Sequence, residues 1–142
     1  MEELKIKKFN IDEVDEITLL TIEQAKKIPN HILRCSDWWW LRSPGFSQFN
    51  VAIVDDDGDV CEYGDDISNK SNAVRPVFRI SNLKSEIGNK IMVGKTLCTV
   101  IDEELTLADY SICKHKFDEE SKNWETSELK GFINSDEFKT MI

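Results

Sequence analysis

The chain has 142 residues, of which 40% are hydrophobic and 32% charged, so it is long enough to bury the core of one globular domain and too apolar for a disordered segment. Its net charge of −9 repels phosphate backbones and anionic lipids, which argues against direct binding to nucleic acid or to a membrane surface. The charged start Met1–Lys5 and the lack of any apolar run of about 20 residues argue against a signal peptide and a membrane span, so we expect a cytoplasmic protein.

The first segment, residues 4–20, is predicted to form two strands around the acidic turn 12–16, because β-prone apolar residues lie on both sides of that turn. A short helix should follow, since Thr21 and Gln24 have the spacing of a capping box. Pro29 is expected to end this helix, and irregular chain should then lead up to the tryptophans.

The strongest signal in the sequence is residues 38–45, Trp-Trp-Trp-Leu-Arg-Ser-Pro-Gly, which hold three of the four tryptophans. Tryptophan has a large apolar ring and an indole N–H that needs a partner once buried, so three in a row cannot all be surface residues. In an extended segment Trp38 and Trp40 share one face and Trp39 takes the other. We therefore expect two rings to enter a core and the third to cover a second layer or to remain partly open.

A hairpin is predicted next, because residues 50–54 and 60–63 are β-prone and flank a turn-rich acidic segment. A two-residue turn on Gly58 and the aspartate before it would place Val54 opposite Cys61. The four aspartates of the turn invite a calcium interpretation. However, their spacing lacks the alternation, and the glutamate after the glycine, of an EF-hand loop. A solvated hairpin tip is therefore favoured over a calcium site.

The remaining elements are a strand, a meander and terminal helices. Residues 74–80 predict a strand in which Pro76 lies at an edge, an end or a bulge, since proline cannot donate to a ladder. Residues 91–108 predict a hairpin or small meander. The last helical segment should begin near Thr126 or Ser127, either of which can act as its N-cap.

We expect residues 1–142 to form a single domain with two halves. The polar segment 81–90 is the best candidate for the connection between the half 1–80 and the half 91–142, because it contains a Gly-Asn pair and little apolar sequence.

Four cysteines lie far apart in the sequence, without a Cys-x-x-Cys pair: Cys35, Cys61, Cys98 and Cys113. This spacing favours four reduced thiols over a disulfide or metal set. His31 with Cys35, and Cys113 with His115, could each supply two zinc ligands, but a complete site would have to join pairs some 80 residues apart. We expect no metal and no cofactor.

Three groups of residues are similar to the signature half of an uncharacterised domain family common in Gram-positive bacteria and their phages: Trp39–Gly45, the hairpin at Gly58, and Val74–Val77. Residues 124–134 are similar to the other half of that family, and residues 19–25 to its central helix. Members of this family resemble the C-type-lectin-like and sulfatase-modifying-factor folds. The resemblance therefore implies an α+β fold with a C-type-lectin-like core of short antiparallel strands and hairpins and two or three short helices.

The order of the halves departs from that family, in which the half similar to residues 124–134 precedes the tryptophan half. One explanation is a circular permutation in which segment 81–90 joins the old termini. The other is that the halves complete each other between two chains, which would make a homodimer rather than a monomer. Because the family has no agreed activity, the resemblance implies a habit of binding and no catalytic residues.

The sequence shows no catalytic constellation. Ser43 precedes a proline instead of lying in a Gly-x-Ser-x-Gly elbow, and no Cys–His pair has a clear orienting partner. Arg42 and Arg75 lie within apolar motifs, where a guanidinium must be paired to be tolerated. Internal pairing with carboxylates is favoured over an anion or carboxylate site beneath the tryptophans.

These observations predict a non-catalytic binding module for a protein or small ligand, derived from a phage or prophage. Its candidate binding residues are Trp38, Trp39, Trp40, Arg42 and Arg75. The alternative is an acidic phage-type inhibitor that occupies a basic host protein by charge mimicry.

Overall fold

The computed structural model describes residues 6–117 and 128–142, which form two β-sheets and four short α-helices. The six-stranded sheet has the order β1 (Lys7–Phe9), β8 (Lys90–Val93), β9 (Thr96–Val100), β10 (Leu105–Ala108), β7 (Val77–Arg79) and β2 (Glu16–Thr18). The five-stranded sheet has the order β11 (Cys113–Lys114), β6 (Ala73–Val74), β3 (Trp39–Pro44), β4 (Asn50–Val54) and β5 (Val60–Asp66).

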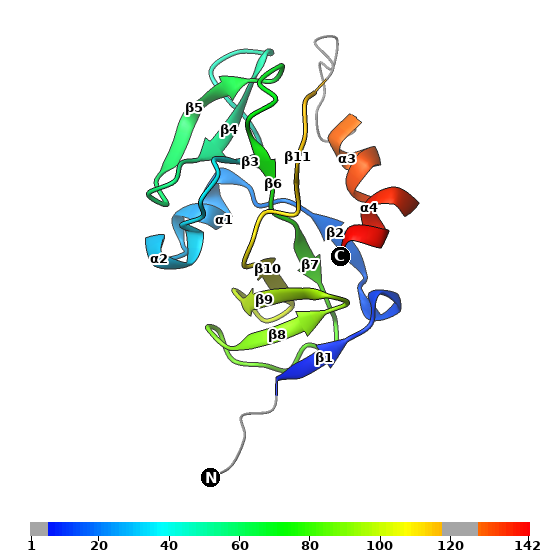
Figure 1. Cartoon of the computed structure of the whole chain (residues 1–142). Coiled ribbons are helices and arrows are strands. Elements are labelled where there is room, and N and C mark those ends of the chain that lie inside the picture. The colour runs from blue at the N-terminus through cyan, green and yellow to red at the C-terminus, as the bar shows by residue number, and fades with distance from the viewer. Residues whose placement is uncertain (1–5, 118–127) are drawn as a thin grey trace.

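The helices lie at the sides of these sheets: the 3-10 turn η1 (Ile11–Glu13), α1 (Ile22–Lys26), α2 (Asn30–Leu33), α3 (Glu128–Ile133) and α4 (Asp136–Met141). Figure 1 shows the five-stranded sheet above the six-stranded one, with α1 and α2 on one side and α3 and α4 beside β11 on the other. The predicted α+β fold is confirmed, with four α-helices instead of two or three. In the described residues, every helix falls short of the length and apolarity needed to cross a bilayer.

The chain passes from one sheet to the other between β6 and β7. The predicted strand over 74–80 is therefore two short strands, separated by Arg75 and Pro76. Proline cannot donate to a ladder, and Pro76 lies directly before the start of β7, an end position and therefore one of those predicted. Its carbonyl still accepts a hydrogen bond from the amide of Ala108, at 3.0 Å.

Strand β3 carries the tryptophan motif and separates two hydrophobic clusters. Trp39 and Trp40 are both 0% exposed and lie in different clusters, because successive side chains of a strand point to opposite faces. Trp38 precedes the strand and remains 45% exposed. Two rings therefore enter the core, as predicted, and the third stays partly open, which is one of its two predicted positions.

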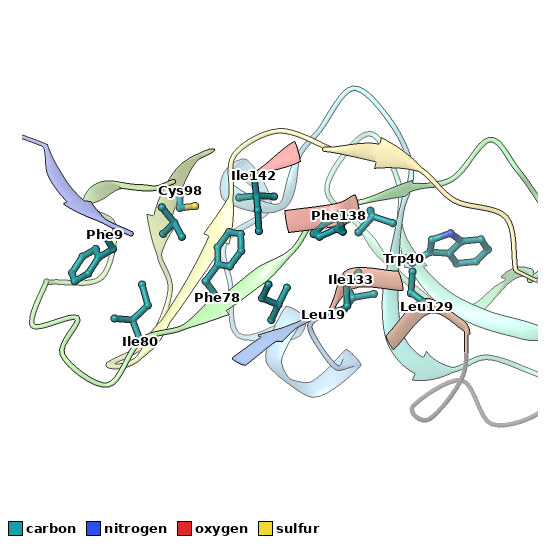
Figure 2. Packing of buried hydrophobic residues seen from close by; sticks show 14 of the residues in the cluster. Phe9, Leu19, Trp40, Phe78, Ile80, Cys98, Leu129, Ile133, Phe138 and Ile142 are labelled. Atoms are coloured by element: carbon teal, nitrogen blue, oxygen red, sulfur yellow. The ribbon is translucent and has the colours of Figure 1, made fainter. Parts of the chain in front are cut away.

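The larger cluster joins the two sheets and the C-terminal helices. Figure 2 shows it extending from Phe9 of β1, past Phe78 of β7, to Trp40 of β3. Between the last two lie buried side chains from α3 and α4, among them Ile133 and Phe138. The core thus depends on apolar residues from both ends of the chain.

The capping box at the start of α1 is confirmed. Thr21 Oγ1 accepts a hydrogen bond from the amide of Gln24 at 3.1 Å, and the amide of Thr21 donates to Gln24 Oε1 at 2.9 Å. The prediction of irregular chain after Pro29 is wrong, because α2 begins at the next residue. Proline ends one helix here and starts another, since its fixed φ and missing N–H suit a helix N-terminus.

The hairpin of β4 and β5 is confirmed, but its predicted register is wrong by one residue. Val54 pairs with Val60 instead of Cys61. The turn has one residue more than expected: the amide of Gly58 donates to the carbonyl of Asp55 at 3.0 Å, and Gly58 has φ +84°. This combination of a β-turn and a left-handed glycine is typical of a three-residue hairpin loop, which shifts the pairing.

Strands from the two sequence halves pair with one another within this single chain. Strand β1 pairs in parallel with β8, and β7 pairs antiparallel with β10. Strands β8, β9 and β10 form the predicted meander. The predicted N-cap at Thr126 or Ser127 lies outside the described residues.

Replacement of either buried tryptophan should strongly destabilise the fold. Trp39→Ala and Trp40→Ala should each lower the free energy of unfolding by about 3–5 kcal/mol, the usual loss for a large buried aromatic side chain. Trp38→Ala is the matched control and should cost about 1 kcal/mol or less, because its ring is half exposed. Urea denaturation of the three variants measures these values; equal losses for all three would contradict the assignment of two core rings.

Neither fragment 1–80 nor fragment 91–142 should fold by itself. Each would expose strand edges and apolar faces that the other covers, since β1 would lose β8 and β7 would lose β10. We expect the separate fragments to aggregate or remain unfolded and their co-expression to give a soluble complex. Cooperative thermal melts from both isolated fragments would show two independent domains instead of one.

Candidate functional site

The structure places the predicted binding residues in three different environments. Trp39 and Trp40 lie wholly in the core, where their indole N–H groups donate to the carbonyls of Leu33, at 3.1 Å, and His115, at 3.2 Å. Their polar atoms are therefore satisfied inside the protein. Of the three rings, Trp38 is the one that presents surface to solvent.

Arg75 is 2% exposed and lies at the crossing between the two sheets. Its Nη1 donates to the carbonyl of Leu33 at 2.9 Å, its Nη2 to that of Ile32 at 2.7 Å, and its Nε to that of Ala108. The favoured pairing with a carboxylate is thus replaced by three backbone carbonyls. Two of them belong to the end of α2, where carbonyls have no partner within the helix.

The face of Trp39 completes the environment of this guanidinium. The Cζ atom of Arg75 lies 5.0 Å from the centroid of the Trp39 ring, within the range of a cation–π interaction. Burial lowers the pKa of Arg75, while the electrostatic influence of nearby Cys35 and Asp109 opposes this effect. Trp39 and Arg75 also share the Leu33 carbonyl, so the segments that contain them form one structural unit with α2.

Arg42 belongs to a separate region of the molecule. It is half buried on β3, and its backbone amide donates to the carbonyl of Leu20 at 2.8 Å. Its side chain lines a cavity of about 260 Å³ together with Glu16 of β2 and Lys130 of α3. Arg75 does not line this cavity, so the two arginines do not converge on one site.

The acidic hairpin tip has a defined geometry. Carboxylate oxygens of Asp55, Asp57 and Asp59 lie within 4.8 Å of one another. Asp55 Oδ1 accepts hydrogen bonds from the amides of Asp57, at 2.9 Å, and Asp59, at 3.0 Å, which makes it a turn-forming residue. Across residues 6–117 and 128–142, no other group of three His, Cys, Asp or Glu side chains comes this close together.

A surface that the sequence analysis did not single out lies on the same hairpin, where the loop before β4 meets β5, whereas the acidic tip follows β4. Phe46 and Tyr63 are 70% and 63% exposed, and their rings are stacked with centroids 4.6 Å apart and planes 8° from parallel. The amide of Phe46 donates to the carbonyl of Tyr63 at 2.7 Å, which holds the loop after β3 against β5. Phe49, in the same loop, is 44% exposed. We call Phe46, Phe49 and Tyr63 the aromatic surface.

The neighbourhood of the aromatic surface in sequence is strongly acidic. Residues 55–66 contain seven carboxylates and no lysine or arginine: Asp55, Asp56, Asp57, Asp59, Glu62, Asp65 and Asp66. Strand β5 is also the edge of the five-stranded sheet. Charged side chains on an edge strand oppose strand-to-strand aggregation, and they also attract cationic partners.

A sequence signal for this surface existed in the loop after Pro44. Two phenylalanines stand there among serine, glutamine and asparagine, a composition typical of exposed loop. The partner ring could not be found in this way, because Tyr63 is 17 positions from Phe46 and meets it through the path of the loop.

Comparison with known protein families identifies the family of this chain. A family model described as "Domain of unknown function (DUF6273)" matches residues 3–82, more than half of the sequence. The chain belongs to the DUF6273 family. The DUF6273 segment contains the tryptophan motif, Arg75 and the whole aromatic surface, and it fits the resemblance to an uncharacterised family. No curated protein and no solved structure matches the chain.

Substitution of Arg75 by lysine should destabilise this DUF6273 protein although the charge is kept. Lysine lacks the planar, forked guanidinium that lets Arg75 reach three separate carbonyls. Buried carbonyls at the end of α2 would therefore lose their hydrogen-bond donors. We expect a loss of about 2–4 kcal/mol in urea denaturation. Arg79→Lys is the matched control, because Arg79 is half exposed and should change stability by about 0.5 kcal/mol or less. Equal effects of the two substitutions would contradict the structural role of Arg75.

Proposed function

We propose that this chain is a non-catalytic binding module that docks a protein partner through the aromatic surface, the partner supplying lysine or arginine side chains. The observation that supports this function best is the stacked, solvent-exposed pair of Phe46 and Tyr63. Exposed aromatic rings that gather in one place are typical of protein-binding sites, since aromatic residues are enriched there over the rest of the surface.

The geometry of the pair suits a binding role. The rings are already ordered by their mutual stacking and by the hydrogen bond between the Phe46 amide and the Tyr63 carbonyl. A pre-ordered aromatic side chain loses little conformational entropy when a partner covers it. Binding could therefore use most of the apolar area of the rings.

The chemistry of the partner follows from charge. The electron-rich faces of aromatic rings attract cations, and so do the seven carboxylates of residues 55–66. Both features favour a basic segment with some apolar residues over a neutral or acidic one. Three of the five candidate binding residues, Trp39, Trp40 and Arg75, have a supporting part in this proposal, because they hold the sheet and α2 in place.

A second candidate is supported by the acidic hairpin alone. In this alternative the chain is a phage-type inhibitor that mimics the charge of an acidic ligand and blocks a basic surface of a host protein. In the first candidate function much of the binding free energy comes from contacts with the aromatic rings. In the second it comes from attraction between charges, which salt screens.

We further propose a C-type-lectin-like fold with permuted halves and a phage or prophage origin. The end of the family segment at residue 82 supports the permutation, because β8, β9 and β10 of the six-stranded sheet follow it. A cytoplasmic location is supported by the four cysteines, all of which are free thiols.

The aromatic surface can be tested with a labelled basic peptide. The probe is a fluorescent peptide of about 12 residues that alternates lysine and leucine, and its affinity is measured by fluorescence anisotropy. The double variant Phe46→Ser/Tyr63→Ser should bind it at least about tenfold more weakly than the unmodified chain. Ile87→Ser is the control, because Ile87 is similarly exposed but lies in the 81–90 connection. Equal binding by the double variant and the control would contradict the proposal.

Salt separates the two candidate functions in the same assay. Binding through the rings should persist in part at about 500 mM salt and still depend on Phe46 and Tyr63. Charge mimicry instead predicts that binding disappears at this salt concentration and that the double variant behaves like the unmodified chain at about 50 mM.

A further inference from the structure

A second cavity lies on a different part of the molecule and has the opposite charge character. It has a volume of about 340 Å³ and is formed by α2 and the residue after it, by the β8–β9 hairpin and by the chain following β10. Its walls include the side chains of Arg34, Arg75 and Lys90, with Asp109 as the one carboxylate. The chain as a whole is acidic, with a net charge of −9, so this local excess of cations contrasts with its overall charge.

The single carboxylate of the cavity is already paired. Asp109 Oδ2 accepts a hydrogen bond from Lys90 Nζ at 2.6 Å, and its Oδ1 accepts one from Thr99 Oγ1 at 2.5 Å. Lys90 Nζ also donates to Thr99 Oγ1, at 2.8 Å. The Asp109 side chain is only 11% exposed, so these contacts hold it in place. Lys90 and Asp109 therefore neutralise each other, and the two guanidinium groups determine the charge of the cavity.

Among the residues that the structure describes, neither of those guanidinium groups forms an ion pair with a carboxylate. In the part of the chain that the structure describes, no carboxylate oxygen lies within 4.0 Å of the nitrogens of Arg34 or Arg75. Arg75 binds only carbonyls, and a guanidinium has more N–H donors than these three carbonyls use. Burial also lowers the pKa of Arg75.

The cavity also offers carbon surface for the remainder of a ligand. Tyr110 is largely exposed at its mouth, and Ile32 is half buried in its wall. A neighbouring hollow of about 500 Å³ shares Arg34, Asp109 and Tyr110 with it, so the two spaces adjoin. Their sizes fall within the range of about 300–1,000 Å³ that is typical of small-molecule sites.

We propose that this cavity binds a small organic anion, whose carboxylate or phosphate group lies between Arg34 and Arg75 and whose carbon skeleton rests on Tyr110. A planar fork of N–H donors suits both kinds of oxyanion. The site is separate from the aromatic surface, since the two share no residue. A chain that binds a basic protein at one surface would then carry a small-ligand site at another.

The test is a titration of the full chain with two probes, sodium benzoate and inorganic phosphate, followed by amide chemical shifts in NMR spectra. The key variant is Arg34→Gln, because Arg34 is exposed and the hydrogen bond by which it caps α2 comes from its backbone amide, which the substitution keeps. Arg79→Gln is the matched control: it removes the same charge from an arginine that is paired with Glu16 and Glu104. A thermal melt of each variant verifies that it is folded.

We expect at least one probe to give saturable shifts at amides of α2, residues 88–90 and residues 109–110. Arg34→Gln should weaken this binding at least about tenfold, and Arg79→Gln should change it less than about twofold. Tighter binding of benzoate would identify a carboxylate ligand, and tighter binding of phosphate a phosphorylated one.

Two results would overturn the proposal. The first is the absence of saturable shifts with both probes up to about 10 mM, since a preformed oxyanion site should reach millimolar affinity. The second is an equal loss in both arginine variants, which would show that the probes respond to overall charge and not to this cavity.

Discussion

The buried guanidinium of Arg75 is the interaction on which the arrangement of the two sheets depends. It lies where the chain leaves β6 for β7, and it binds the last carbonyls of α2, the carbonyl at the end of β10 and the face of Trp39. One side chain therefore joins elements of both sheets and a helix. A buried charge is costly unless it is fully solvated by protein dipoles, so these partners have to remain in place while the protein is folded.

The aromatic surface and the cavity lined by Arg34 and Arg75 both depend on this buried framework. Because Arg75 holds the end of α2, the next residue, Arg34, is placed at the rim of the cationic cavity. Strand β3 carries Trp39 and Trp40 into separate clusters and ends at Pro44, and the loop that follows it meets β5, where the amide of Phe46 bonds the carbonyl of Tyr63. The tryptophans thus contribute to binding as structural supports, while the exposed rings come from residues with a weaker sequence signal.

Local chemistry explains which elements could be predicted. Thr21 and Gln24 cap α1 through bonds within one helical turn, and Pro76 interrupts a strand through its own missing N–H. The errors occurred where a local pattern allowed more than one geometry. Pro29 can end or begin a helix, and the glycine turn can hold two or three residues, which decides whether Val54 faces Cys61 or Val60.

The sequence by itself determined the α+β class, the positions of most hairpins and the burial of two of the three adjacent tryptophan rings, because these depend on periodicity, turn residues and apolar area. Only the tertiary structure decided the partners of Arg75, which lie 33 to 43 positions away along the chain, and the stacking of Phe46 on Tyr63. The same holds for the cationic cavity, whose walls come from α2, β8, β9 and the chain after β10. Such contacts join residues distant in sequence, so their geometry is set by how the two sheets pack and not by any local pattern.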